Sequence, residues 1–139
     1  MKSALVLSKG IIKIPQLTSF FPEFDNIVFG KGAGKYDCVM GWGFKKTATR
    51  ARRYAASQSV SYIAIEDGFI RSRGLGVEGS PPLSLVVDPV GIYYDARQPS
   101  LLEQLIVQGS EFPEAFQDRV QSCMSSIRKH RLSKYNQLS

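Results

Sequence analysis

The chain has 139 residues, which is the length of one ordinary domain. Hydrophobic residues make up 43% of it, so a packed core is expected and a disordered chain is excluded. The net charge of +6 favours anionic partners, namely nucleic acid, phosphorylated sugars, nucleotides or an acidic membrane surface. A basic surface without a binding role is the alternative.

Cysteine and histidine usage argues against a metal or redox centre. The two cysteines, Cys38 and Cys123, lie far apart in the sequence and have no metal-ligand spacing, and His130 is the single histidine. We therefore predict no metal and no cofactor. The apolar run near the N-terminus is too short for a signal peptide or a membrane-spanning helix. These features predict a cytoplasmic protein with reduced thiols, in which any membrane contact is peripheral.

The first half of the chain alternates between predicted strands and helices. Short apolar runs at residues 3–7, 26–30, 38–43 and 61–67 predict four strands. A helix is predicted over residues 45–59, with a narrow face of small side chains formed by Ala48, Ala51 and Ala55. Another face of that helix carries Lys46, Arg50 and Arg53. The alternation predicts an α/β fold with a mainly parallel, Rossmann-like sheet.

The second half predicts a small β-hairpin and two helices. Residues 83–87 read as a strand, 88–91 as a type I turn, and 92–95 as the returning partner strand. Ser100 and Glu103 have the spacing of a capping box. In the helix that follows, four apolar side chains are expected to face inward: Leu101, Leu102, Leu105 and Ile106. A final amphipathic helix is predicted from an apolar stripe at Phe112, Phe116, Val120, Cys123 and Ile127.

Two glycine-rich stretches resemble nucleotide-binding motifs only by letters. Gly74, Gly76 and Gly79 match G-x-G-x-x-G, but no strand ends directly before them and prolines follow. Residues 30–35, "GKGAGK", lack the first glycine and the final Ser or Thr of a P-loop. Neither stretch is predicted to bind a nucleotide.

The stretch "EDGFIRSRGLG" carries the candidate chemistry. Glu66 and Asp67 end a predicted strand, and ligands of open α/β sheets bind beyond the carboxyl ends of strands. Carboxylates there can transfer protons, and Arg71 and Arg73 suit phosphate or carboxylate. The alternative is a charged loop in which Asp67 and Gly68 form an Asx turn.

Trp42 and Phe44 flank Gly43 at the end of another predicted strand. They are interpreted either as core residues or as a surface on which an acceptor stacks.

Three ordered motifs give the sequence a family resemblance. "EDGFIRSRGLG", "PPLSLVVDPVGIYYDARQPSLLEQL" and "LSKYN" resemble the capsule polysaccharide Kdo transferases of the KpsC/LipA type. That family transfers Kdo from CMP-Kdo to a lipid-linked acceptor during capsule assembly in Gram-negative bacteria. Its modules are GT-B-like, with the active site between two Rossmann-like domains.

The resemblance assigns roles by position. It implies that Glu66 and Asp67 are catalytic, Glu66 in acid/base work or acceptor positioning and Asp67 in ordering the loop. It implies that the substrate is bound by Arg71, Ser72, Arg73, Tyr94, Asp95 and Lys134. Asp88 and Tyr93 match the hairpin motif. Ser133, Tyr135 and Asn136 complete the "LSKYN" motif.

The resemblance also predicts the domain organisation. Residues 1–131 would form the acceptor-side Rossmann-like domain, and residues 132–139 would begin the inter-domain segment, truncated. The catalytic aspartate of a D-Q-T-F-x-D segment and the domain that binds CMP-Kdo would lie beyond the chain, which would be inactive alone. The expected partners are the lipid-linked sugar acceptor and capsule assembly proteins at the cytoplasmic face of the inner membrane.

Two alternatives belong to other functional classes. One is a non-catalytic basic module that docks capsule assembly machinery at the membrane through Lys46, Arg50 and Arg53. The other is a nucleic-acid binder, which is disfavoured because the aromatic residues are not interleaved with the cations.

Overall fold

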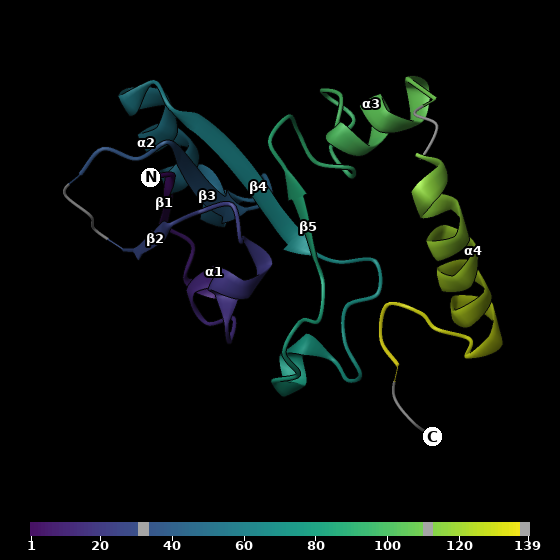
Figure 1. Cartoon of the computed structure of the whole chain (residues 1–139). Helices are drawn as coiled ribbons and strands as arrows, with labels where there is room; N and C mark the ends of the chain where they lie inside the picture. The colour runs from purple at the N-terminus through teal and green to yellow at the C-terminus, as the bar shows by residue number, and fades with distance from the viewer. Residues whose placement is uncertain (31–33, 110–112, 137–139) are drawn as a thin grey trace.

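The computed structural model describes residues 1–30, 34–109 and 113–136, and within these ranges the strands form one sheet (Figure 1). Its order is β2-β1-β3-β4-β5. The strands are β1 (Ser3–Val6), β2 (Asn26–Phe29), β3 (Cys38–Trp42), β4 (Ser61–Asp67) and β5 (Leu85–Asp88). The first four are mutually parallel and β5 is antiparallel to β4. The predicted α/β fold with a mainly parallel sheet is confirmed.

Helical segments connect and flank the strands. They are α1 (Lys9–Ile12), η1 (Leu17–Phe20), η2 (Lys46–Ala48), α2 (Thr49–Gln58), η3 (Gly76–Glu78), α3 (Leu101–Val107) and α4 (Glu114–Lys129). The helix predicted over residues 45–59 is therefore a 3₁₀ turn followed by α2. The short α1 was not predicted, because four residues are too few to show a helical period.

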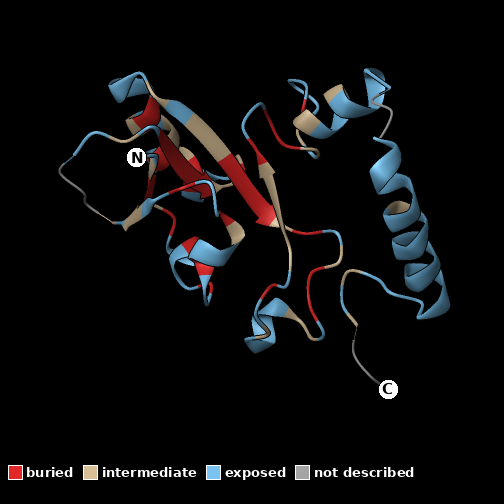
Figure 2. Ribbon diagram, in the orientation of Figure 1, coloured by how far each residue is buried: buried red, intermediate tan, exposed pale blue. Residues whose placement is uncertain are grey.

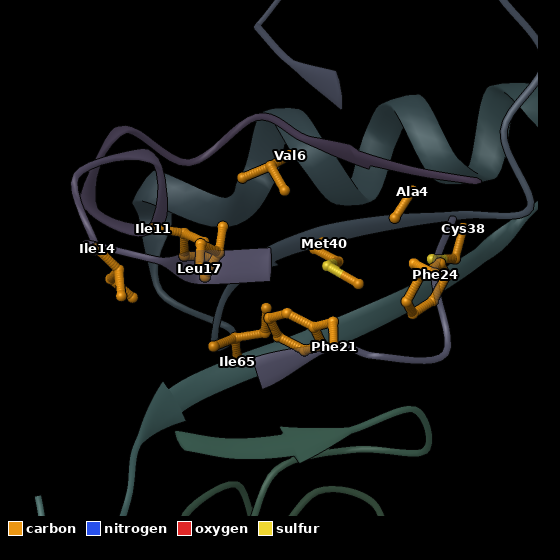
Figure 3. Close-up of a cluster of buried hydrophobic side chains, with 10 residues drawn as sticks. All are labelled: Ala4, Val6, Ile11, Ile14, Leu17, Phe21, Phe24, Cys38, Met40 and Ile65. Carbon is orange, nitrogen blue, oxygen red and sulfur yellow. The ribbon is translucent and has the colours of Figure 1, made fainter. Parts of the chain in front are cut away.

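The core has one layer on each face of the sheet. On the face covered by α1 and η1, Met40 and Ile65 of the sheet pack with Ile11 and Phe21 (Figure 3). On the opposite face, Ala51 and Ala55 of α2 pack on Leu5 and Val39. The predicted small-residue face of this helix is confirmed, since Ala48, Ala51 and Ala55 are all buried.

A glycine in β3 lets α2 lie close to the sheet. A Cβ placed on Gly41 would lie 3.1 Å from the Ala51 Cβ and 2.5 Å from the Tyr62 hydroxyl oxygen. Small side chains on both surfaces thus bring the helix down onto β3 and β4. This contact fixes the position of the loop between β3 and α2, which contributes to the site described below.

The predicted β-hairpin is wrong in its partner strand. Residues 92–95 form a turn in which the Asp95 backbone N–H donates to the Ile92 carbonyl at 2.9 Å. The antiparallel neighbour of β5 is β4, with Leu85 opposite Asp67 and Asp88 opposite Ala64. After β5 the Val90 and Gly91 N–H groups bond to the Asp88 side chain, and the chain turns away instead of returning along the free edge of β5.

Asp88 holds the chain as it leaves β5. This buried side chain accepts hydrogen bonds at Oδ1 from the backbone N–H groups of Val90 and Gly91, both at 2.8 Å. Its Oδ2 accepts from the Leu101 N–H at 3.0 Å, in the first turn of α3. The predicted capping box at the start of α3 is confirmed, with Ser100 and Glu103 each bonded to the other's backbone N–H.

The inward orientation predicted for the apolar side chains of α3 is wrong for three of the four, and only Leu101 is partly buried. Leu102, Leu105 and Ile106 are exposed, and α4 has no buried residue (Figure 2). The helix predicted from the last apolar stripe is confirmed as α4, although Phe112 lies outside the described residues. Helical periodicity reveals an apolar face but not what covers it.

We predict that Asp88→Ala destabilises the protein strongly. The three backbone N–H groups lose their acceptor, so unfolding in urea should show a loss of roughly 2–4 kcal/mol. Asp118→Ala, on the exposed surface of α4, is the control and should change the stability by less than about 0.5 kcal/mol. Equal effects of the two changes would show that Asp88 does not anchor this segment.

Candidate functional site

The two carboxylates of the "EDGF" motif lie on opposite faces of the sheet. Both belong to β4, where successive side chains alternate between the faces. Glu66 is on the α2 face and meets Lys45, whereas Asp67 pairs with Arg71. The structure therefore does not bring Glu66 and Asp67 together as a catalytic pair.

Glu66 is a buried carboxylate with an unused acceptor. It is 6% exposed, and its Oε2 receives no hydrogen bond of normal geometry from the described residues. Lys45 Nζ lies 3.4 Å from Oε2 and 3.5 Å from Oε1. Oε2 is therefore held by an ion pair with a largely exposed lysine and not by a close hydrogen bond, so a hydrogen-bond donor supplied by a ligand could pair with it.

Gly43 makes this arrangement possible. It follows β3 with a φ of 52°, in the left-handed region that glycine adopts most easily. A Cβ here would lie 2.0 Å from the Tyr94 hydroxyl oxygen and 2.9 Å from Glu66 Oε2. The missing side chain is therefore the space in which Tyr94 and Glu66 approach each other.

Two neutral phenols surround this space. Burial raises the pKa of Tyr94, and the neighbouring Glu66 carboxylate adds to the rise because it disfavours a phenolate. The Tyr94 hydroxyl oxygen accepts a hydrogen bond from the Phe44 N–H at 3.1 Å. Burial also raises the pKa of Tyr62, whose hydroxyl donates to the Gly43 carbonyl at 2.6 Å. Both phenols therefore keep their hydroxyl hydrogen at neutral pH, and Tyr62 uses it to hold the Gly43 carbonyl.

Aromatic rings extend from this position along the surface. The ring centres of Tyr94 and Tyr93 are 5.4 Å apart, and those of Tyr93 and Phe69 are 5.0 Å apart. Phe69 is 56% exposed and Tyr94 43% exposed, so the row offers apolar faces to a ligand. The sequence pointed to Tyr94, and the structure places it beside Glu66.

Asp67 and Arg71 organise the loop that follows β4. Arg71 is buried, and its Nε donates to Asp67 Oδ1 at 2.6 Å. Its Nη1 donates to Ser72 Oγ and to the Ser80 carbonyl, both at 2.8 Å. Gly76 lies directly against the guanidinium, where a Cβ would be 2.7 Å from Nη2. The stretch with G-x-G-x-x-G letters thus packs against Arg71 and itself forms a 3₁₀ turn, not the start of a nucleotide-binding helix.

The "LSKYN" segment is joined to this loop across more than sixty residues. The Lys134 carbonyl accepts from the N–H groups of Arg71 and Ser72, at 2.9 and 3.3 Å. The Asn136 N–H returns a bond to the Ser72 carbonyl at 3.0 Å, and Ser72 and Tyr135 form a parallel bridge. The Asn136 side chain also closes the segment on Ser133. The structure therefore brings together Arg71, Ser72 and Lys134, which the sequence predicted separately.

Asp95 is paired with Arg97. The Arg97 side chain donates to both carboxylate oxygens of Asp95 at 2.7 Å. This pairing lowers the pKa of Asp95 to about 2. Arg73, the remaining predicted binding residue, is exposed on the loop surface.

Lys45 and Arg52 are residues of this site that the sequence reasoning missed. Lys45 follows the end of β3 as Glu66 ends β4, so the rule about carboxyl ends of strands could have identified it. Arg52 lies four residues after Ala48, on the inward side of α2, with its guanidinium 5.2 Å from the Phe44 ring centre. Its Nε is buried without a hydrogen-bond partner among the described residues.

The remaining residues singled out in the sequence lie outside the Glu66 site. Lys46, Arg50 and Arg53 are exposed, as the solvent-facing side of the helix requires. Trp42 is partly buried and packs against the core on the α1 face. In the part of the chain that the structure describes, no three His, Cys, Asp or Glu side chains are grouped to hold a metal. No described helix is long and apolar enough to cross a membrane.

We predict that Arg97→Gln returns the pKa of Asp95 from about 2 toward the ordinary aspartate value of 3.8. The cation favours the ionised carboxyl, so its removal must raise the pKa. Any stability linked to this pair is present above pH 3.8 and is lost as the pH falls through 3.8 toward 2. Carbon-13 NMR of the Asp95 carboxyl during acid titration measures the shift, and an unchanged midpoint in the variant would contradict the assignment.

The comparisons with known proteins identify proteins of capsule polysaccharide and lipopolysaccharide synthesis or modification. A family model described as capsule polysaccharide biosynthesis protein matches residues 37–138. The capsule polysaccharide modification protein LipA of Neisseria meningitidis serogroup A is 46% identical over 136 residues. The lipopolysaccharide-processing protein LpsZ of Rhizobium meliloti is 44% identical over 96 residues. The chain spans 19% of the LipA protein and 22% of LpsZ.

Solved structures give the same result. The β-Kdo 2,4 transferase of Thermosulfurimonas dismutans KpsC superposes with a TM-score of 0.84 at 44% identity, over 97% of this chain and 42% of that one. The β-Kdo 2,7 transferase of the same KpsC superposes with a TM-score of 0.61 at 30% identity, over 93% of this chain and 43% of that one. The chain therefore belongs to the capsule polysaccharide biosynthesis protein family, of the KpsC/LipA type.

Proposed function

We propose that this chain supplies the acceptor-side part of a glycosyltransferase that transfers Kdo from CMP-Kdo to a lipid-linked acceptor. Residues 1–131 would form the acceptor-side domain of a GT-B-like module, and residues 132–139 would begin the segment leading to the donor side. The reaction would take place at the cytoplasmic face of the inner membrane, with capsule assembly proteins. Family membership and the likeness to a β-Kdo 2,4 transferase support this proposal.

The buried Oε2 of Glu66 is the observation that carries the proposal. It is an acceptor without a normal hydrogen bond from the described residues, at the carboxyl end of β4, where ligands of α/β sheets bind. The atoms around it are the Lys45 ammonium and the Tyr94 hydroxyl. The side chain of Lys45 is 58% exposed, so it can move aside as a substrate enters.

An acceptor hydroxyl fits this position chemically. Its O–H would donate to Glu66 Oε2, and its oxygen would attack the anomeric carbon of Kdo. The bond from that carbon to the phosphate oxygen breaks, CMP leaves, and the hydroxyl proton passes to Glu66. General-base assistance of this kind contributes typically about 10²–10⁴-fold to a rate.

The other predicted residues would act around this step. The exposed faces of Phe69 and Tyr94 would hold the apolar side of a sugar ring. Asp67 would keep the Arg71 side chain in place. Through its bond to the Ser80 carbonyl, Arg71 would order the loop from residue 71 to residue 80. Arg73 and Lys134 would offer cations to the acidic substrate from the outer surface of the same loop.

We predict that Glu66→Gln strongly slows transfer without unfolding the protein. The assay uses a chimera in which this chain replaces the matching 42% of the T. dismutans β-Kdo 2,4 transferase, with CMP-Kdo and a Kdo-primed lipid acceptor. Because the amide cannot take the acceptor proton, the rate of CMP release should fall about a hundredfold or more. The melting temperature should stay near that of the parent chimera.

Asp67→Asn tests whether the second carboxylate has a structural role that differs from the catalytic role of Glu66. It leaves the buried Arg71 without its charge partner, so it should cost roughly 2–4 kcal/mol of stability. Asp118→Asn, on the exposed surface of α4, is the control and should change neither the rate of CMP release nor the stability. The proposal is wrong if the folded chimera releases CMP equally fast with Gln at position 66, or if the folded parent chimera transfers no Kdo.

A further inference from the structure

A pocket of about 400 Å³ lies at the carboxyl ends of β1 and β3. Its lining residues are Leu7, Ser8, Lys9, Gly10, Trp42 and Thr47. The first four follow β1, Trp42 ends β3, and Thr47 belongs to η2. The volume is within the range of about 300–1,000 Å³ that is usual for small-molecule sites.

The position of this pocket follows from the strand order. From β1 the chain goes to β2 on one side of the sheet and then to β3 on the other, so the order reverses between β1 and β3 (Figure 1). The loops that follow β1 and β3 therefore leave toward opposite faces and part from each other. In open α/β sheets, ligands bind in the crevice formed at such a reversal.

The floor of the pocket combines an aromatic ring with a hydroxyl group. Trp42 is partly buried, with core residues packed against it. Ser8 is 4% exposed, and its Oγ accepts from the Trp42 backbone N–H at 3.0 Å. No oxygen of the described residues accepts the hydrogen of this hydroxyl, so Ser8 can donate it to a ligand. An aromatic face with a few polar groups is the usual composition of a sugar-sized site.

The charge of the pocket favours an anion. Lys9 stands at the exposed rim and forms no ion pair within the described ranges. The lining contains no Asp or Glu side chain to neutralise it. Thr47 adds a second hydroxyl from the other wall. A ring with one carboxylate and several hydroxyl groups matches this set of partners.

One segment contributes residues both to the pocket and to the Glu66 site. The segment between β3 and α2 places Lys45 on Glu66 and, two residues later, Thr47 in the pocket. We propose that the pocket binds an acidic sugar of the acceptor, with its ring on Trp42 and its carboxylate on Lys9. The identity of this sugar as Kdo rests on the proposed function.

Trp42 is the single tryptophan of the chain, so its fluorescence reports directly on this pocket. The experiment titrates the 139-residue chain with the methyl β-glycoside of Kdo, up to roughly 10 mM. A saturable change in emission is expected. Lys9→Met should weaken binding about tenfold or more, because it removes a charge-assisted contact. The C1 carboxamide of the same glycoside lacks the carboxylate, so it should bind to the unaltered chain about as weakly as the acid binds to the Lys9→Met variant.

Lys13→Met is the matched control, since it removes the same charge from an exposed position just after α1 and outside the pocket. It should leave the affinity unchanged. The proposal is overturned if no saturable change occurs, if Lys9→Met and Lys13→Met act alike, or if the carboxamide or inorganic phosphate binds as well as the acid. Proton–nitrogen NMR shifts at the Trp42 and Ser8 amides give a second readout. Because neither readout needs turnover, failure here is distinct from failure of Kdo transfer.

Discussion

The alternation of side chains along β4 is the constraint on which the site depends. Because Glu66 and Asp67 are neighbours in a strand, they must point to opposite faces of the sheet. Glu66 consequently meets the loop after β3, whereas Asp67 is free to pair with the buried Arg71. The two neighbouring residues therefore have different roles: Glu66 supplies a carboxylate on one face, and Asp67 stabilises the following loop on the other.

Long-range backbone contacts hold the parts of the site in register. The Lys134 carbonyl fixes the loop at Arg71 and Ser72, and Asp88 fixes the turn that precedes Tyr94. Neither contact could be formed by the first seventy residues alone. This explains why motifs scattered over the second half of the chain accompany a site whose central residue, Glu66, lies in the first half. The apolar faces of α3 and α4 remain exposed beyond this framework (Figure 2).

Local patterns predicted most of the sheet, α2 and the Ser100 capping box, because each rests on neighbouring residues. Pairing was less predictable: residues 92–95 have a strand-like composition, yet they form a turn, and β5 has β4 as its partner. The exposure of Leu105 and Ile106 was missed for a similar reason, since periodicity does not identify what covers a face. In the site, Glu66 and Tyr94 were anticipated, but the role of Gly43 as their meeting place depends on tertiary distances that no local pattern encodes.

The most direct measurement of the central claim is a crystal structure of the chain with a short Kdo glycoside of the acceptor type bound. The account predicts a sugar hydroxyl within about 3 Å of Glu66 Oε2, on the face that carries Tyr94 and Lys45. It also predicts that the Asp67–Arg71 pair is unchanged by the sugar. A sugar bound on the opposite face, at Asp67 with Arg71 released, would contradict the division of roles between the two carboxylates.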